Sequence, residues 1–391
     1  MNLLLRFSRS GLEHGIRSCM VFITVLFITL CLVRAGEAFH SGGAGECKEC
    51  HKDEKGSLRW SDASSTCLRC HQAPMGTRRP TGHYIASNDQ DVRAGMPPSQ
   101  LTPGGDFGYL KKSYSWRESG STVNSPGERH GHNIVAVDYG YIADSKHSVT
   151  PGGMYPGSAL SCISCHDPHG KISSDTYRLL GGIGYTTRLA PGMSFTVDAP
   201  VAVAPRDYNR SEASTNTRVA YGRRMSEWCS NCHMNGCTGA YGHPVCNGAR
   251  CTNEIISSYN AYVKSGDING RGDASYTSLV PFEEGTDDRS VLEQHAKNDG
   301  TYAMGPGFGS NVMCLTCHRA HASAWDHMAR WNMASEFIVQ KGVYPGTNNG
   351  SPEGDAQGRS EAETQKAYYE RPVTLFAAYQ RGLCNKCHIR D

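Results

Sequence analysis

Residues 47–51 read Cys-Lys-Glu-Cys-His, and this Cys-x-x-Cys-His pattern occurs six times in the 391-residue chain. Each copy can attach one c-type haem, because its two thiols add to the vinyl groups of the porphyrin and its histidine binds the iron. The chain is therefore expected to carry six covalently bound haems. The residues that would attach them are Cys47, Cys50 and His51; Cys67, Cys70 and His71; Cys162, Cys165 and His166; Cys229, Cys232 and His233; Cys314, Cys317 and His318; and Cys384, Cys387 and His388.

Two other uses of Cys-x-x-Cys fit the sequence less well. A thioredoxin-type dithiol needs one such pair at a helix start in a βαβ unit, and no histidine need follow it. A structural zinc site needs a second cysteine or histidine pair at short spacing. Here a histidine follows every pair, and the first cysteines of successive motifs are 20, 95, 67, 85 and 70 residues apart. The pattern favours haem attachment.

The first 38 residues are typical of an export signal. Three arginines precede an apolar run over 19–33, and small residues mark a cleavage site that ends at Ala38. The run has 15 residues, fewer than the ~20 of a membrane-spanning helix. A lipoprotein signal at Cys31 is disfavoured because a large leucine precedes it. We expect residues 1–38 to be a signal peptide and 39–391 to be the exported mature chain, with no transmembrane span left. Its destination would be extracellular or the cell surface, with the periplasm as the alternative.

The composition of the mature chain predicts a fold that haem holds together. Removing residues 1–38 leaves 35 basic and 35 acidic side chains, so nothing indicates a nucleic-acid partner. The chain has 44 glycines and 18 prolines, and little apolar periodicity with which to build its own core. Six porphyrins would supply the missing apolar surface. We expect one hexahaem domain over 39–391, coil-rich with a few short helices, with the polypeptide wrapped around a row of six haems.

Local signals predict few regular elements. Helices are expected at 253–264, 288–298, 325–338 and 361–387, the last broken near Pro372, and loops at 95–108, 148–158 and 343–358.

The sixth coordination position of each iron separates an electron carrier from a haem enzyme. The mature chain has 16 histidines, of which ten lie outside the motifs, enough to close six haems with two imidazoles each. His169 and His321 are the strongest candidates. Each lies three residues after a motif histidine, on the same local turn, and would therefore reach a neighbouring haem. The other expected iron ligands are His83, His132, His243 and His295.

Alternatives to this ligand set are surface or hydrogen-bonded histidines, and methionine as a rival ligand. We expect His40, His130, His147 and His327 to be such non-ligands. Three further cysteines, Cys237, Cys246 and Cys251, lack a following histidine. Two of them could form a disulfide, but the spacing does not say which two.

Several passages resemble the hexahaem outer-surface c-type cytochromes of metal-reducing bacteria that polymerise into nanowires, the OmcS type. They are FHSGG at 39–43, TPGGDFGYLKK at 102–112, GHNIVA at 131–136, CHDPHG at 165–170, MSEWC at 225–229, PFEEGT at 281–286, CHRAHAS at 317–323 and LCNKCH at 383–388. The resemblance runs through the whole mature chain. It implies six bis-histidine haems in a continuous chain, and self-association into head-to-tail filaments that pass electrons to extracellular metal oxides, other c-type cytochromes or partner cells.

One position departs from the family pattern. In the resembled family, a histidine three residues after the first motif binds a haem of the adjoining subunit, whereas this chain has Glu54 there. A glutamate does not readily replace imidazole in such a site. Either another histidine crosses the interface, His40 being the nearest, or the bond between subunits is absent. The three extra cysteines also fall where the family pattern shifts.

Two other functions compete with a secreted electron carrier. A periplasmic shuttle would share all of its chemistry and differ in location. A multihaem reductase of small oxyanions would need a lysine in place of a motif histidine or an open iron, and all six motifs end in histidine. We therefore expect no enzymatic activity.

Overall fold

The computed structural model describes residues 47–74, 84–99, 102–170, 176–205, 217–237, 243–262, 270–347 and 351–388. The chain divides into two units, Met1–Gly45 and Glu46–Asp391, and every described residue belongs to the second. The signal peptide expected at 1–38 lies outside the described residues.

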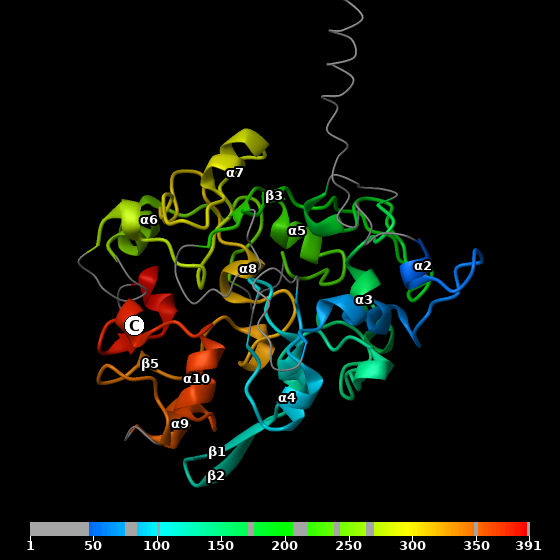
Figure 1. Cartoon of the computed structure of the whole chain (residues 1–391). Helices are drawn as coiled ribbons and strands as arrows, with labels where there is room; N and C mark the ends of the chain where they lie inside the picture. Colours follow the sequence, from blue (N-terminus) through cyan, green and yellow to red (C-terminus); the bar gives the residue numbers. More distant parts are fainter. Residues whose placement is uncertain are drawn as a thin grey trace, which may run out of the picture. The chain divides into compact units, whose positions relative to one another are not determined.

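Short helices separated by long stretches of coil make up the described chain (Figure 1). The longest helix, α3 (Ala63–His71), has 9 residues and is capped by the side chain of Asp62. The other α-helices are α2 (Cys47–Cys50), α4 (Asp89–Arg93), α5 (Met225–Cys229), α6 (Asn253–Asn260), α7 (Arg289–His295), α8 (Cys314–Cys317), α9 (Glu353–Ala356) and α10 (Glu361–Ala367). The expected coil-rich fold with a few short helices is confirmed.

Sheet structure within the described residues consists of three two-stranded antiparallel ribbons. The longest joins β1 (Tyr114–Glu118) to β2 (Ser121–Ser125), with Trp116 opposite Val123. The other two pair β3 (Ala202–Val203) with β4 (Ala220–Tyr221), and β5 (Phe337–Val339) with β6 (Gln380–Arg381).

Two of the four expected helices form close to where the sequence predicts them. Helix α6 begins at Asn253 with Thr252 as its cap, and α7 lies within 288–298. The helix expected over 325–338 was wrong. That stretch holds a single 3-10 turn, η8 (Asp326–Met328), in which His327 has a left-handed φ of 59°, and its end joins strand β5.

The long helix expected over 361–387 was also wrong beyond its first turns. Helix α10 ends at Ala367, and the chain then forms a 3-10 turn, η10 (Val373–Leu375), strand β6 and a second 3-10 turn, η11 (Leu383–Lys386). Proline at 372 removes a backbone donor and disfavours helix in the residue before it, which separates the two halves.

Aromatic side chains dominate the main core. Tyr344 stacks on Tyr368 with ring centroids 5.3 Å apart, and Phe376 and Trp325 pack against the same ring. Cations are buried among these rings: the Arg359 guanidinium lies 4.4 Å from the centroid of Trp325 and 4.0 Å from that of Tyr114. The core thus relies on a few large rings, because short coil segments have no apolar stripe to bury.

Within the described ranges, no helix combines the length and apolar character that a membrane crossing requires.

Candidate haem-binding sites

Every Cys-x-x-Cys-His motif forms one helical turn. In five of them the histidine N–H donates to the carbonyl of the first cysteine: His51 to Cys47 at 2.8 Å, His166 to Cys162 at 3.0 Å, His233 to Cys229 at 2.9 Å, His318 to Cys314 at 3.0 Å and His388 to Cys384 at 3.0 Å. The remaining motif, 67–71, forms the end of α3. Positions i, i+3 and i+4 share one face of such a turn, so both sulfurs and the imidazole are presented to the same side.

Two pairs of consecutive motifs are joined in the same way. The thiols of Cys67 and Cys162 are hydrogen-bonded to each other, and the Cys162 N–H donates to Ser64 Oγ at 3.2 Å. The thiols of Cys229 and Cys314 are likewise hydrogen-bonded, and the Cys314 N–H donates to Ser226 Oγ at 2.9 Å.

Both serines precede the first cysteine of the earlier motif by three residues. Sequence reasoning missed this role, although the shared Ser-x-x-Cys spacing was visible. The same serine and thiol contacts therefore join motif 67–71 to motif 162–166, and motif 229–233 to motif 314–318.

The other consecutive motifs are also neighbours in space. Burial raises the pKa of one cysteine in each of three motifs, and a thiol of the adjacent motif raises it further: Cys50 beside Cys70, Cys165 beside Cys232, and Cys317 beside Cys384. Each motif therefore lies beside the next one in the sequence, an arrangement that suits short electron-transfer steps.

Four motif histidines face a histidine from elsewhere in the chain at nearly constant spacing. The ring centroids are 6.1 Å apart for His51 and His169, 6.5 Å for His166 and His321, 6.1 Å for His233 and His132, and 6.1 Å for His388 and His243. An imidazole nitrogen binds a metal at about 2.0–2.1 Å, so two imidazoles on opposite sides of one ion have centroids about 6 Å apart. The observed spacing leaves room for one iron between each pair.

The imidazoles are also in the tautomer that a metal requires. Nδ1–H donates to a backbone carbonyl in His132 (Ala320, 2.8 Å), His166 (Arg178, 2.8 Å), His233 (Pro151, 2.9 Å), His243 (Pro244, 3.2 Å) and His318 (His327, 2.8 Å). The other nitrogen, Nε2, is then unprotonated and can bind iron, while the carbonyl fixes the orientation of the ring. These residues fit c-type haem.

Burial keeps the most enclosed of these rings neutral. Burial, together with neighbouring histidines, lowers the pKa of His132 to about 4 and that of His321 to about 3. Burial lowers the pKa of His318 as well. A ligating imidazole must be neutral, so these sites are ready for metal at ordinary pH.

The remaining predicted ligands are placed differently. His83, expected opposite one of the motif histidines, lies outside the described residues. His295 stacks on Tyr302 at 4.0 Å between centroids, and its Nδ1 is hydrogen-bonded to the Glu284 carboxylate. Among the described residues, no ring contact joins His295 to a motif histidine, and none joins His318 to another histidine.

The structure selects one of the possible cysteine pairs. Cys237 and Cys246 form a disulfide, with Cα atoms 5.5 Å apart, and Cys251 is a buried free thiol.

A cofactor that needs two adjacent thiols, the imidazole beside them and a second imidazole opposite is c-type haem. The fold and these sites thus define a multihaem c-type cytochrome. No protein-family model matches the chain. The C-type cytochrome OmcS of Geobacter sulfurreducens is 44% identical over 416 aligned positions, which cover 91% of this chain and 95% of that protein. The chain belongs to the OmcS family of c-type cytochromes.

Solved structures agree with the sequence match. The Outer Membrane Cytochrome S Filament from Geobacter sulfurreducens has a TM-score of 0.80 and 43% identity, covering 90% of this chain and 100% of that one. The OmcS nanowires from the same organism, determined by cryo-EM, give a TM-score of 0.80 at 42% identity with the same coverage. The resemblance drawn from the sequence passages is confirmed.

Proposed function

We propose that this chain is an exported hexahaem electron carrier that relays electrons through closed, two-histidine haem sites to extracellular acceptors. The observation that carries the proposal is the set of four histidine pairs at 6.1–6.5 Å between centroids. An iron with an imidazole on each side changes little on reduction, which suits electron transfer rather than catalysis. When bound, haem supplies a one-electron couple.

The protein's own residues have three tasks in this proposal. The motif cysteines fix each porphyrin, the paired histidines hold its iron from both sides, and the backbone carbonyls on Nδ1 orient the imidazoles. The proposed second ligands are His169, His321, His132 and His243, with His83 for the motif at 67–71. We leave His295 out of the proposed set because, among the described residues, no motif histidine faces its ring.

We further propose that copies of the chain associate head to tail. The relatives are named as a filament and as nanowires, and the described chain provides no imidazole opposite His318. A second copy could supply that ligand, His40 being a candidate. Metal oxides, other c-type cytochromes or partner cells would then be the acceptors, and the exported, signal-cleaved chain over 39–391 the active form.

The test uses the haem-loaded protein secreted by its host. Electron micrographs at high protein concentration are expected to show filaments, and monomers alone would overturn the filament proposal. The carrier proposal predicts that the ferrous protein binds carbon monoxide at none of the four paired haems and does not turn over nitrite. Stoichiometric carbon monoxide binding at a paired site together with turnover of nitrite would instead establish a reductase.

A further inference from the structure

Two of the four paired distal histidines, His169 and His243, are exposed, and of these only His169 directly follows a haem motif. His132 donates its backbone N–H to the His321 carbonyl at 2.9 Å, and the backbone N–H of His321 donates to the Gly104 carbonyl at 2.8 Å. His169 lies three residues from a motif that would be bonded to haem, and its N–H donates to Asp167 at 3.1 Å. His243 is exposed, and the hydrogen bond found for its imidazole goes to Pro244, the next residue.

The Cys237–Cys246 disulfide closes a ring that contains His243. The two cysteines are 9 residues apart, and His243 lies three residues before the second. Both partners of the bond are anchored close to the motif at 229–233. Cys237 follows a turn in which the Gly236 N–H donates to the His233 carbonyl at 2.8 Å.

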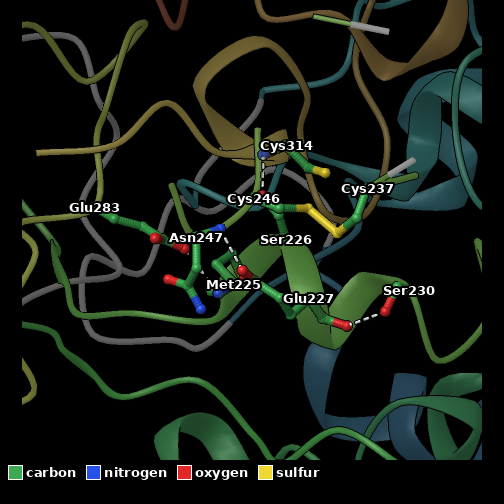
Figure 2. The surroundings of a disulfide bond; sticks show 9 residues. All are labelled: Met225, Ser226, Glu227, Ser230, Cys237, Cys246, Asn247, Glu283 and Cys314. Atoms are coloured by element: carbon green, nitrogen blue, oxygen red, sulfur yellow. Dashed lines mark hydrogen bonds between the residues drawn. A yellow bond between two sulfur atoms is a disulfide. The ribbon is translucent and has the colours of Figure 1, made fainter. Parts of the chain in front are cut away.

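The second end of the ring is fastened to the helix that carries the same motif. Figure 2 shows the disulfide beside α5, with the N–H of Asn247, the residue after Cys246, directed at the Glu227 carboxylate. Val245, the residue before Cys246, packs against the main core. Without the disulfide, the backbone alone would connect Cys237 to this anchored end, through the residues that include His243.

We infer that the Cys237–Cys246 disulfide is a positioning device that holds His243 opposite His388 as the second iron ligand of the haem at 384–388. The disulfide fastens the segment that carries His243 to the motif at 229–233, whereas its imidazole would bind the iron at 384–388. The geometry of one haem site therefore depends on the geometry of the other. A covalent ring restricts the positions open to His243 and raises its effective concentration at the iron. The inference rests on the proposed assignment of His243 as a ligand.

The experiment compares the haem-loaded wild-type protein with the C237S/C246S double variant. Cyanide binding to the ferric protein is counted per chain, and the high-spin iron signal is measured by electron paramagnetic resonance. The double variant is expected to bind about one more cyanide per chain than the wild type and to gain a matching high-spin signal, because an iron that loses its imidazole accepts an outside ligand. C251S is the matched control, because the buried Cys251 thiol lies near Cys387 of the motif at 384–388 but takes no part in the disulfide.

A third variant, H243A, separates the two possible failures. If H243A does not open one haem, the proposed ligand assignment is wrong. If H243A opens a haem while C237S/C246S retains wild-type cyanide binding and spectrum, His243 is a ligand but the disulfide does not position it, and the inference is overturned. A loss of stability without any change at the iron would also count against it.

Should the double variant fail to load six haems, mature wild-type protein replaces it. A phosphine reductant, which takes up oxygen from water, delivers two electrons and two protons to the disulfide. The thiols are then alkylated and the haems reoxidised in air. One additional cyanide site supports the inference, and an unchanged count contradicts it. Finding free thiols at both positions in untreated protein also contradicts it.

Discussion

Replacing Glu283 by glutamine is expected to stabilise the protein at alkaline pH. The Glu283 side chain is 0% exposed and lies between two haem motifs. Its carboxylate accepts the Met225 N–H of α5 at 2.8 Å, and its backbone pairs with Asn311, three residues before Cys314. Glu283 Oε2 and Asn311 Oδ1 are both buried without a hydrogen-bond partner. A neutral glutamine keeps an acceptor for the Met225 N–H without the buried charge.

The size of the effect follows from the pKa. Burial, and to a lesser degree the charge of Glu227, raises the pKa of Glu283 from 4.5 to about 7. At about 1.4 kcal/mol per pH unit, ionising this group in the folded protein costs about 3 kcal/mol more than in the unfolded chain. Because the folded protein binds the proton more tightly, stability is greatest below pH 4.5 and falls as the pH rises to about 7.

The free energy of unfolding of the haem-loaded protein, measured in guanidinium chloride at pH 4.5 to 8, tests this reasoning. E283Q should be about 3 kcal/mol more stable than the wild type at pH 8, and the difference should shrink steadily toward pH 4.5. E293Q is the matched control, since Glu293 is an exposed residue of α7. A difference that does not vary with pH, or an E283Q protein less stable at pH 8, would show that Glu283 is ionised and well solvated in the folded state.

Three further substitutions probe the haem sites and the core. H132M should convert one haem to histidine–methionine ligation and raise its reduction potential. A spectroelectrochemical titration should then show one haem at higher potential than in the wild type. An unchanged titration curve would contradict the assignment of His132 as a ligand. S226A removes the acceptor of the Cys314 N–H and should lower the free energy of unfolding by about 1–2 kcal/mol; no loss would mean that water replaces the hydroxyl. R359K keeps the charge but loses the planar contacts with Tyr114 and Trp325 and the bonds to the Ala324 carbonyl. It should cost about 2–3 kcal/mol in the same unfolding assay, and a wild-type value would show that a lysine ammonium suffices.

The sequence predicted the class of fold because the haem motifs are local and chemically explicit. Its errors lie where tertiary contacts override local preference. The stretch 325–338 has helix-forming residues, yet its backbone bonds to distant partners: the Arg330 N–H donates to the Cys317 carbonyl, and the Phe337 segment pairs with Arg381. Neither contact can be read from neighbouring residues.

The distal histidines were harder to predict than the motifs, for the same physical reason. Each facing pair joins residues more than a hundred positions apart, as with His51 and His169 or His243 and His388. The three-residue spacing in CHDPH and CHRAH predicted that His169 and His321 reach a haem other than their own, and in the structure each faces the histidine of a different motif. No such local signal accompanies His295, which the sequence also predicted as a ligand; its ring stacks on Tyr302 and faces no motif histidine among the described residues.

The pairs that do carry the signal follow a rule that bears on Glu54. The histidine after the third motif, His169, faces the first motif, and the histidine after the fifth motif, His321, faces the third. In both cases the histidine faces the motif two places earlier in the chain. By the same step, the haem of the fifth motif, with His318, would take its second ligand from the residue three positions after the first motif of a following copy. That residue is Glu54 in this chain. With His40 removed as a competing ligand, H40A/E54H should therefore close the fifth haem in assembled protein and abolish carbon monoxide binding there, whereas H40A alone and dilute H40A/E54H monomer still bind it. If carbon monoxide binding is the same in H40A/E54H and H40A at every protein concentration, the rule does not extend across copies.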